Sequence, residues 1–187
     1  MQERGGQPGP EDRAPDSDDT ARVALLEFWE VARPRAKVAP VPEWTGLGVV
    51  GSIVPPAWSF GDSPELADSL LQLVLDGVKT GTSTAAAELV ASDEPEPRRG
   101  DLSIVLDGRG RPGALIRTTS VTRCRFDEVD AEHAAAEGED DRSLTSWRAE
   151  HERYWRRVLP AIGVEFSPAL ELVLERFTLL YPRPNDR

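Results

Sequence analysis

A run of carboxylates is the first feature of the sequence that could do chemistry, and it comprises Glu137, Glu139, Asp140 and Asp141. Clustered carboxylate oxygens are the ligands that Mg²⁺ and Mn²⁺ prefer in proteins. The spacing does not demand a metal, and an acidic segment exposed to solvent would explain the run equally well. With two histidines and one cysteine, the chain has too few ligands for a dedicated zinc cluster. We therefore predict no resident metal.

Aromatic side chains suggest a second kind of chemistry, the binding of single-stranded RNA. Tryptophan rings can stack on unpaired bases, and the candidates are Trp58, Trp147 and Trp155. Trp147, His151 and Trp155 also follow one another at intervals of four residues. That spacing is typical of a helix face that packs on a core, so both interpretations stay open for these rings.

Three arginines extend this hypothesis. Arg117, Arg123 and Arg125 are separated by even numbers of residues, along a predicted strand and the residues that follow it. On a regular strand they would share one face. That face is expected to be exposed to solvent, or to contact phosphate groups of a nucleic acid.

The overall charge limits the possible partners. The chain carries a formal net charge of −11 at pH 7, whereas proteins that bind long nucleic acids usually present a basic surface. We therefore expect no binding of long DNA, and a small nucleoside or a short single-stranded RNA as the partner. The single cysteine, Cys124, excludes an internal disulfide and is expected to be a half-buried strand residue.

The sequence contains no sign of a membrane segment. No stretch reaches the ~18 consecutive apolar residues that a membrane-spanning helix needs. The first 19 residues are polar and acidic, and they lack the apolar segment of a secretory signal. We therefore expect a cytoplasmic protein that does not bind a membrane.

The N-terminal part of the chain is expected to be peripheral. Residues 1–19 contain almost no apolar side chains, which predicts a disordered acidic leader. Residues 20–57 are expected to form a helix and then a Pro/Gly-rich loop, both packing on the core. Thr20 is the predicted N-cap of this helix, which should end before Pro34. Residues 58–187 are expected to form the main domain.

Signals in the main domain predict both helices and strands. Ser63 and Pro64 suit the N-cap and first position of a helix that Gly77 ends, and residues 79–84 read as extended. Residues 102–107 and 114–122 should form a hairpin. A short helix is expected over 127–136, a second one after an N-cap at Ser143, and a final strand over 170–180. This order lacks a βαβ rhythm, so an α+β fold with a mostly antiparallel sheet is expected.

Five segments in order resemble the ASCH (activating-signal-cointegrator homology) family, in its branch of larger bacterial proteins. The resemblance runs from Trp58 to the C-terminal strand. The segments are Trp58-Ser59-Phe60-Gly61-Asp62; Asp76-Gly77-Val78-Lys79-Thr80-Gly81-Thr82-Ser83; Gly100-Asp101; Phe126-Asp127-Glu128-Val129 with 132–139; and Ser143-Leu144-Thr145-Ser146-Trp147-Arg148 with His151, Tyr154 and Trp155. The second segment matches the family's Gly-x-Lys-x-x-Thr signature.

The resemblance implies a β-barrel fold like that of RNA-binding PUA domains, with mostly antiparallel strands and flanking helices. It implies a cleft for RNA or a modified nucleoside. Some small members are amidohydrolases that remove an acyl group from cytidine, and their site residues correspond to Lys79, Thr82 and Glu137. Residues expected to contact the substrate are Trp58, Thr80, Ser83, Arg117 and His133. Other members are ribonucleases that depend on a divalent metal such as Mg²⁺ or Mn²⁺, and a non-catalytic RNA- or nucleotide-binding module is a further alternative.

The chemistry of the three signature residues is consistent with amide hydrolysis. Thr82 would supply the nucleophilic hydroxyl, Lys79 would stabilise the developing anion, and Glu137 would carry the proton. Residues three apart on a regular strand face opposite sides, so Lys79 and Thr82 meet only if the backbone bulges at Gly81. The small amidohydrolases have an arginine where this chain has Thr84, a departure that weakens the expectation of deacylation.

Overall fold

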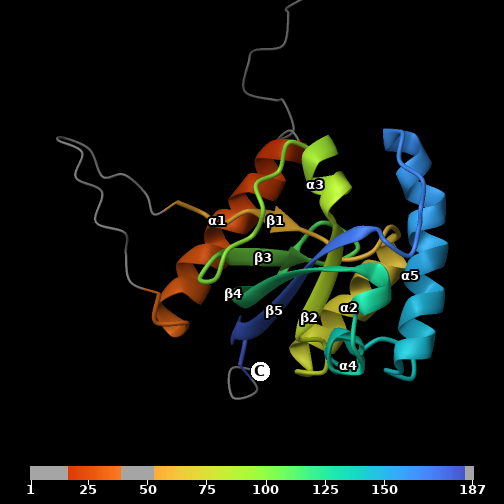
Figure 1. Ribbon diagram of the computed structural model, residues 1–187. Coiled ribbons are helices and arrows are strands. Elements are labelled where there is room, and N and C mark those ends of the chain that lie inside the picture. Colours follow the sequence, from red (N-terminus) through yellow and green to blue (C-terminus); the bar gives the residue numbers. More distant parts are fainter. Residues whose placement is uncertain (1–16, 39–52, 184–187) are drawn as a thin grey trace, which may run out of the picture.

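The computed structural model describes residues 17–38 and 53–183 of the chain. Its elements, in chain order, are α1 (Ser17–Arg35), β1 (Ala57–Trp58), α2 (Pro64–Leu75), β2 (Gly81–Ala85), α3 (Ala86–Ala91), β3 (Leu102–Leu106), β4 (Pro112–Arg125), the 3-10 turn η1 (Phe126–Glu128), α4 (Ala131–Glu137), α5 (Leu144–Val158), the 3-10 turn η2 (Leu159–Ile162) and β5 (Glu171–Tyr181). The expected α+β fold is confirmed (Figure 1).

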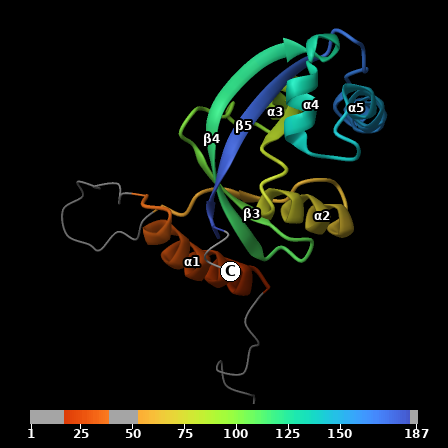
Figure 2. The same cartoon turned by 90° about the horizontal axis from the view of Figure 1, so that it is seen from below.

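One five-stranded sheet organises the fold, with strands in the order β1-β3-β4-β5-β2. The β1–β3 pair is parallel and the other three pairs are antiparallel, as expected of a mostly antiparallel sheet. β4 and β5 form a long bent ribbon through the middle (Figure 2). β1 and β2 are the two edges and do not pair with each other, so the sheet curves without closing into a barrel.

Helices cover the ribbon at both ends. α1 packs at one end through Trp29, Ala32 and Ala36, which contact the strand residues Ile104 and Leu115. α4 and α5 pack at the other end (Figure 2), in a second cluster of buried residues. A third cluster joins α2 to the sheet. No helix in the described part of the chain is long and apolar enough to cross a membrane.

Local signals placed α2 correctly. The Ser63 side chain accepts a hydrogen bond from the Leu66 backbone N–H, Pro64 occupies the first helical position, and Gly77 has a φ of +71° just after the C-cap. The φ of Gly77 belongs to the left-handed region that glycine adopts without strain. The β3–β4 hairpin and the Ser143 N-cap of α5 also agree with the sequence prediction.

The boundaries of α1 differ from the prediction. The helix begins at Ser17, so Thr20 is not its N-cap and residues 17–19 are helical. It also includes Pro34, because the Ala36 N–H still bonds to the Ala32 carbonyl at 2.8 Å and both alanines are buried against the sheet. Tertiary packing therefore carries the helix past its proline. Residues 1–16 of the leader and 39–52 of the Pro/Gly-rich loop lie outside the described residues.

The helix predicted over 127–136 is divided in two. η1 ends at Glu128, and Val129 and Asp130 are extended, with ψ values of 131° and 169°. α4 then begins at Ala131, because the Asp130 side chain accepts a hydrogen bond from the His133 N–H and caps the helix. This break sets the direction of α4 and hence the position of Glu137 at its last turn.

Candidate functional site

Two backbone segments run against each other and create the site. After α2 ends, the Thr80 N–H bonds to the Ala136 carbonyl at the end of α4, at 2.7 Å. Gly138 follows α4 with a φ of +75°, and a Cβ there would lie 2.7 Å from the Val78 carbonyl oxygen. Glycine is therefore needed both for its conformation and for the close approach. The result is that Lys79 lies beside Glu137.

Glu137 is the centre of a buried polar network, with 2% of its surface exposed. Its Oε1 accepts hydrogen bonds from Ser83 Oγ at 2.5 Å and Trp147 Nε1 at 2.7 Å, and lies 3.2 Å from His133 Nε2. Its Oε2 lies 3.4 Å from Lys79 Nζ and 3.6 Å from His151 Nε2. A buried carboxylate needs partners of this kind, because an unpaired charge would be very costly there.

Lys79 is also buried and fully hydrogen-bonded. It is 1% exposed, and its ammonium group bonds to Glu139 Oε1 at 2.7 Å and to the Glu137 carbonyl at 3.4 Å. The ring of Phe60 lies 5.0 Å from Nζ and completes the enclosure by a cation–π contact. All three protons of the ammonium group therefore have acceptors within the protein. Glu139, 31% exposed, carries the network to the surface.

The network perturbs the ionisation of two of its members. Burial alone would raise the pKa of Glu137, but the Lys79 charge and hydrogen bonds from His133 and His151 hold that pKa well below its usual range. Burial alone would lower the pKa of His151, but Glu137 raises it above the ordinary histidine value. An ionised Glu137 is a poor proton carrier, so its position suits an anion that fixes the surrounding donors.

The signature threonine is separated from this network. β2 pairs with β5 in regular register, with Thr82 opposite Glu175. Because Ser83 points to Glu137, the alternation of a strand places the Thr82 side chain on the other face. The bulge that would bring Lys79 and Thr82 together is not present. The structure thus joins Lys79 and Glu137 with Ser83 instead, a residue predicted only as a substrate contact.

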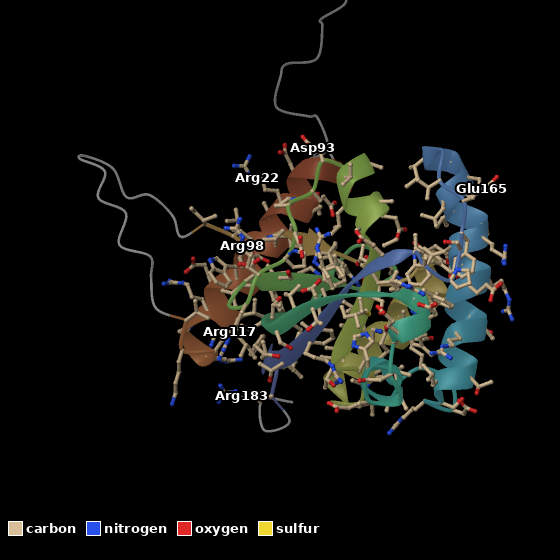
Figure 3. All side chains as sticks on the ribbon, viewed as in Figure 1. Arg22, Asp93, Arg98, Arg117, Glu165 and Arg183 are labelled. Atoms are coloured by element: carbon tan, nitrogen blue, oxygen red, sulfur yellow. The ribbon has the colours of Figure 1, made fainter. Side chains whose placement is uncertain are left out.

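The other predicted contact residues are divided between two regions. His133 lies in the network, and Thr80 is adjacent, with Oγ1 3.4 Å from the Ala136 carbonyl. Trp58 packs edge-on against Phe60, with ring centroids 4.6 Å apart, and Phe60 in turn contacts Lys79. Arg117 lies toward α1, away from α4 and α5 (Figure 3).

The arginine stripe is not formed. An extra residue, Thr119, shifts the β4–β5 register between Thr118 and Ser120. Such a bulge reverses which side chains face which way, so Arg117 lies on the opposite face from Arg123 and Arg125. The latter two form ion pairs with Glu96 and Asp127. A shared phosphate-binding face is therefore ruled out for the three arginines.

Two of the three tryptophans are unavailable for stacking on bases, because Trp147 and Trp155 are 5% and 0% exposed. The helical spacing thus indicated a core face. Sequence reasoning missed that Trp147 Nε1 and His151 Nε2 reach Glu137. The four-residue interval between His133 and Glu137 was the one available signal of such contacts.

The acidic run is used for hydrogen bonding within the protein. Asp140 accepts a bond from Ser146 Oγ, and Asp141 accepts one from the Ser143 N–H at the start of α5. Among the residues that the structure describes, no group of three or more His, Cys, Asp or Glu side chains is arranged to hold a metal ion. The Mg²⁺ or Mn²⁺ alternative therefore has no geometric support in the run.

Comparison with known proteins identifies the family. The ASCH domain family matches residues 56–181. An ASCH domain from Lactobacillus crispatus JV V101 superposes with a TM-score of 0.72 and 27% identity, over 86% of this chain and 96% of that one. A protein from Enterococcus faecalis V583 gives 0.71 and 29%, over 86% and 91%. No curated protein matches. Because the family match spans more than half of the sequence and agrees with the fold, the chain belongs to the ASCH domain family.

Proposed function

We propose that this RNA-binding-type domain takes up a single nucleobase, of a nucleoside or of a short single-stranded RNA. The site is the surface at which Glu139 and His151 emerge from the Lys79 network. The observation that carries the proposal is that these two side chains are 31% and 15% exposed while Lys79 and Glu137 are buried. They are thus hydrogen-bonding groups that solvent can reach and that the protein holds in place.

The chemistry of this surface suits the edge of a base. A glutamate carboxylate accepts hydrogen bonds from an exocyclic amine such as that of cytosine. Glu139 is oriented for this by its 2.7 Å bond to Lys79. The His151 ring is held by stacking on Trp147 with ring centroids 4.2 Å apart. Pre-positioned side chains lose little entropy on binding, so one nucleobase is a sufficient ligand.

The net charge of −11 supports a small ligand over a long one. Binding of a long RNA would depend mainly on phosphate contacts with lysine and arginine. Lys79, the cation of the network beneath this surface, is enclosed by the protein. The proposal therefore predicts weak dependence of affinity on salt concentration.

The test is a calorimetric titration of the full chain with cytidine, N-acylcytidine and a short single-stranded RNA. Glu139→Gln should weaken binding by about tenfold, since one charge-assisted hydrogen bond is lost. Asp140→Asn is the matched control, because it removes the same charge one residue away and should leave affinity unchanged. Equal affinity of the wild type and Glu139→Gln for all three ligands would refute the proposed surface.

A second candidate function, hydrolysis of an amide on such a nucleoside, is favoured by the position of Ser83. Its hydroxyl lies 3.0 Å from His133 Nε2 and 2.5 Å from Glu137 Oε1, and the side chain is partly exposed. A hydroxyl within hydrogen-bond reach of an imidazole meets the geometric requirement for an activated nucleophile, and the imidazole takes the hydroxyl proton in the tautomer that leaves Nε2 unprotonated. We propose that Ser83 takes the role expected of Thr82 if the chain is a hydrolase.

Turnover of N-acylcytidine by matched alanine variants tests this second proposal. Ser83→Ala should abolish turnover, whereas Thr82→Ala on the opposite face of β2 should retain most of it. The reverse pattern would show that Thr82 is the nucleophile and that β2 rearranges in solution. No turnover by the wild-type protein would remove the hydrolase proposal and leave the binding proposal to its own test.

A further inference from the structure

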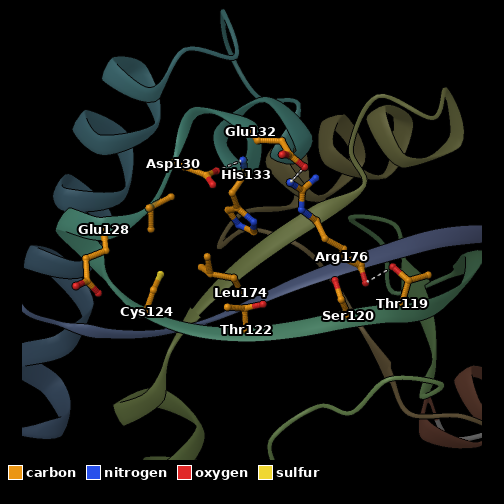
Figure 4. Close-up of a pocket in the computed structure, with 11 residues that line it drawn as sticks. Thr119, Ser120, Thr122, Cys124, Glu128, Asp130, Glu132, His133, Leu174 and Arg176 are labelled. Carbon is orange, nitrogen blue, oxygen red and sulfur yellow. Dashed lines mark hydrogen bonds and ion pairs between the residues drawn. The ribbon is translucent and has the colours of Figure 1, made fainter.

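A pocket of about 540 Å³ lies between α4 and the β4–β5 ribbon (Figure 4). Its size falls within the range of about 300–1,000 Å³ that is usual for small-ligand sites. Hydroxyls of Ser120 and Thr122 line it from β4, and Leu174 and Val129 provide apolar surface. Of the residues discussed above for the nucleobase surface, none lines this pocket, so it is a separate site.

His133 connects the pocket with the buried network. The side chain is 6% exposed and lines the pocket (Figure 4). Its Nε2 lies 3.2 Å from Glu137 Oε1 and 3.0 Å from Ser83 Oγ. An ionised carboxylate only accepts hydrogen bonds, so Nε2 carries a proton, and in the tautomer with its proton on Nε2 the other nitrogen, Nδ1, is an acceptor.

Nδ1 of His133 has no hydrogen-bond partner among the described residues. It is not one of the fully buried side-chain atoms without a partner, which in the described part of the chain are Arg33 Nε and Arg148 Nε. Nδ1 therefore reaches solvent, and the pocket is the cavity that the ring lines. Nδ1 is therefore an acceptor that a ligand in the pocket can reach and to which it can donate a hydrogen bond.

Two carboxylates of the lining are acceptors as well. One oxygen of Glu128 bonds to the Arg125 N–H and one oxygen of Asp130 caps α4, which leaves the second oxygen of each carboxylate available. The one cation of the lining that is always charged, Arg176, is paired with Glu132 at 3.2 Å. The pocket therefore has an excess of negative charge.

The pKa of the Cys124 thiol is consistent with this excess of negative charge. Burial raises its pKa, and the charges of Glu128 and Asp130 raise it further. A phosphate or carboxylate ligand would meet this repulsion, whereas a cation would be attracted.

We propose that this pocket binds a small organic cation, an alkylammonium group on a short carbon chain, through Glu128, Asp130 and Nδ1 of His133. The ammonium protons bond to the free carboxylate oxygens and to the imidazole, and the carbon chain lies on Val129 and Leu174. The same ammonium chemistry occurs in free diamines and in lysine side chains, and the pocket is assigned to the free diamine. Because His133 also touches Glu137, an occupied pocket is linked directly to the Lys79 network.

Calorimetric titration of the full chain with butane-1,4-diamine tests the proposal. The variant Glu128→Gln/Asp130→Asn keeps a side-chain oxygen that accepts from the Arg125 N–H and another that accepts from the His133 N–H and caps α4, while it removes two charges. It should weaken binding by at least about tenfold. The control Glu150→Gln/Glu165→Gln removes two charges from side chains that solvent reaches and that do not line the pocket, and it should bind like the wild type. Equal weakening in both variants would show only general attraction to an acidic protein and overturn the site.

Nitrogen NMR of His133 provides a second measurement that does not depend on affinity. The free protein should show a protonated Nε2 and an unprotonated Nδ1, and the diamine should shift the Nδ1 resonance. A protonated Nδ1 in the free protein, or no shift at saturation, would overturn the proposal. Inorganic phosphate should not compete with the diamine. Tighter binding of a blocked lysine peptide than of the diamine would overturn the assignment to a free amine.

Discussion

Replacement of Glu137 by glutamine should destabilise the protein more than any other change of a single charge in the site. Glutamine keeps the size of the side chain but turns one carboxylate oxygen into an NH₂ group. In either orientation this donor faces other donors, because Ser83 and Trp147 bond to one oxygen, and Lys79 and His151 lie at the other. Glu137→Gln therefore leaves at least one buried donor without an acceptor and removes the charge that balances Lys79.

The expected magnitude follows from burial. Lys79 and Glu137 are 1% and 2% exposed, so solvent cannot replace the lost partner. Breaking a buried ion pair by removing one member typically costs about 3–5 kcal/mol. That is a large part of the ~5–15 kcal/mol that stabilises a typical domain. At about 2–4 °C per kcal/mol for a chain of this length, the Tm should fall by roughly 10 °C.

Urea unfolding followed by circular dichroism measures this loss. Glu139→Gln is the matched control, because its side chain is 31% exposed and solvent can replace the carboxylate; we expect a loss of about 1 kcal/mol or less there. Adding Lys79→Met to Glu137→Gln should recover part of the stability, since it removes a buried charge that Glu139 alone would otherwise balance. A loss below about 1 kcal/mol for Glu137→Gln would refute the view that Glu137 organises the site.

Two further predictions concern pH and backbone geometry. The pKa of Glu137 is depressed in the folded state, so its contribution to stability is present above the ordinary carboxyl value of 4.5 and is lost as pH falls through the folded pKa. The pKa of His151 is raised, so its contribution to stability is complete below pH 6.5 and is lost as pH rises through the folded pKa. Urea unfolding at a series of pH values checks both expectations. In His151→Gln, the loss of stability with rising pH should be smaller. A stability that increases steadily through neutral pH would contradict the second expectation. Gly138→Ala should cost about 1–3 kcal/mol of unfolding free energy, because its φ is +75° and the new Cβ would lie 2.7 Å from Val78 O. The control Gly77→Ala has a φ of +71° but nothing within 4 Å, so it should cost less; equal losses would mean that the close approach at Gly138 is unimportant.

Short-range signals were sufficient for much of the fold. The Ser63 cap, Pro64 and Gly77 define α2 through interactions within a few residues, and the β3–β4 hairpin is likewise a local structure. α1 shows where such signals fail. Pro34 indicated a helix end, but burial of Ala32 and Ala36 against the sheet extends the helix past it. The preference of proline for a helix end is outweighed here by the packing of the two alanines.

Part of the site was also predictable from short-range signals in the sequence. Lys79 belongs to a recognisable signature, and Glu137 lies on a helix whose end the sequence marks with Gly138. Their pairing was expected from the family resemblance, and the structure brings them together. Neither the sequence nor the resemblance indicated that the pair would be fully enclosed, because enclosure depends on Phe60 and Trp147 from distant segments.

By itself the sequence determined α2, the β3–β4 hairpin, the start of α5 and the final strand, together with the family and the small set of side chains from which a site could be built. Only the tertiary structure decided which of them meet. The alternation of side chains along β2 directs Ser83, not Thr82, toward Glu137. The bulge at Thr119 separates Arg117 from Arg123, and α5 places His151 next to Glu137. The physical reason is that capping and turn preferences act over a few residues. The face on which a side chain emerges depends instead on strand register and helix packing, which contacts across the whole chain establish.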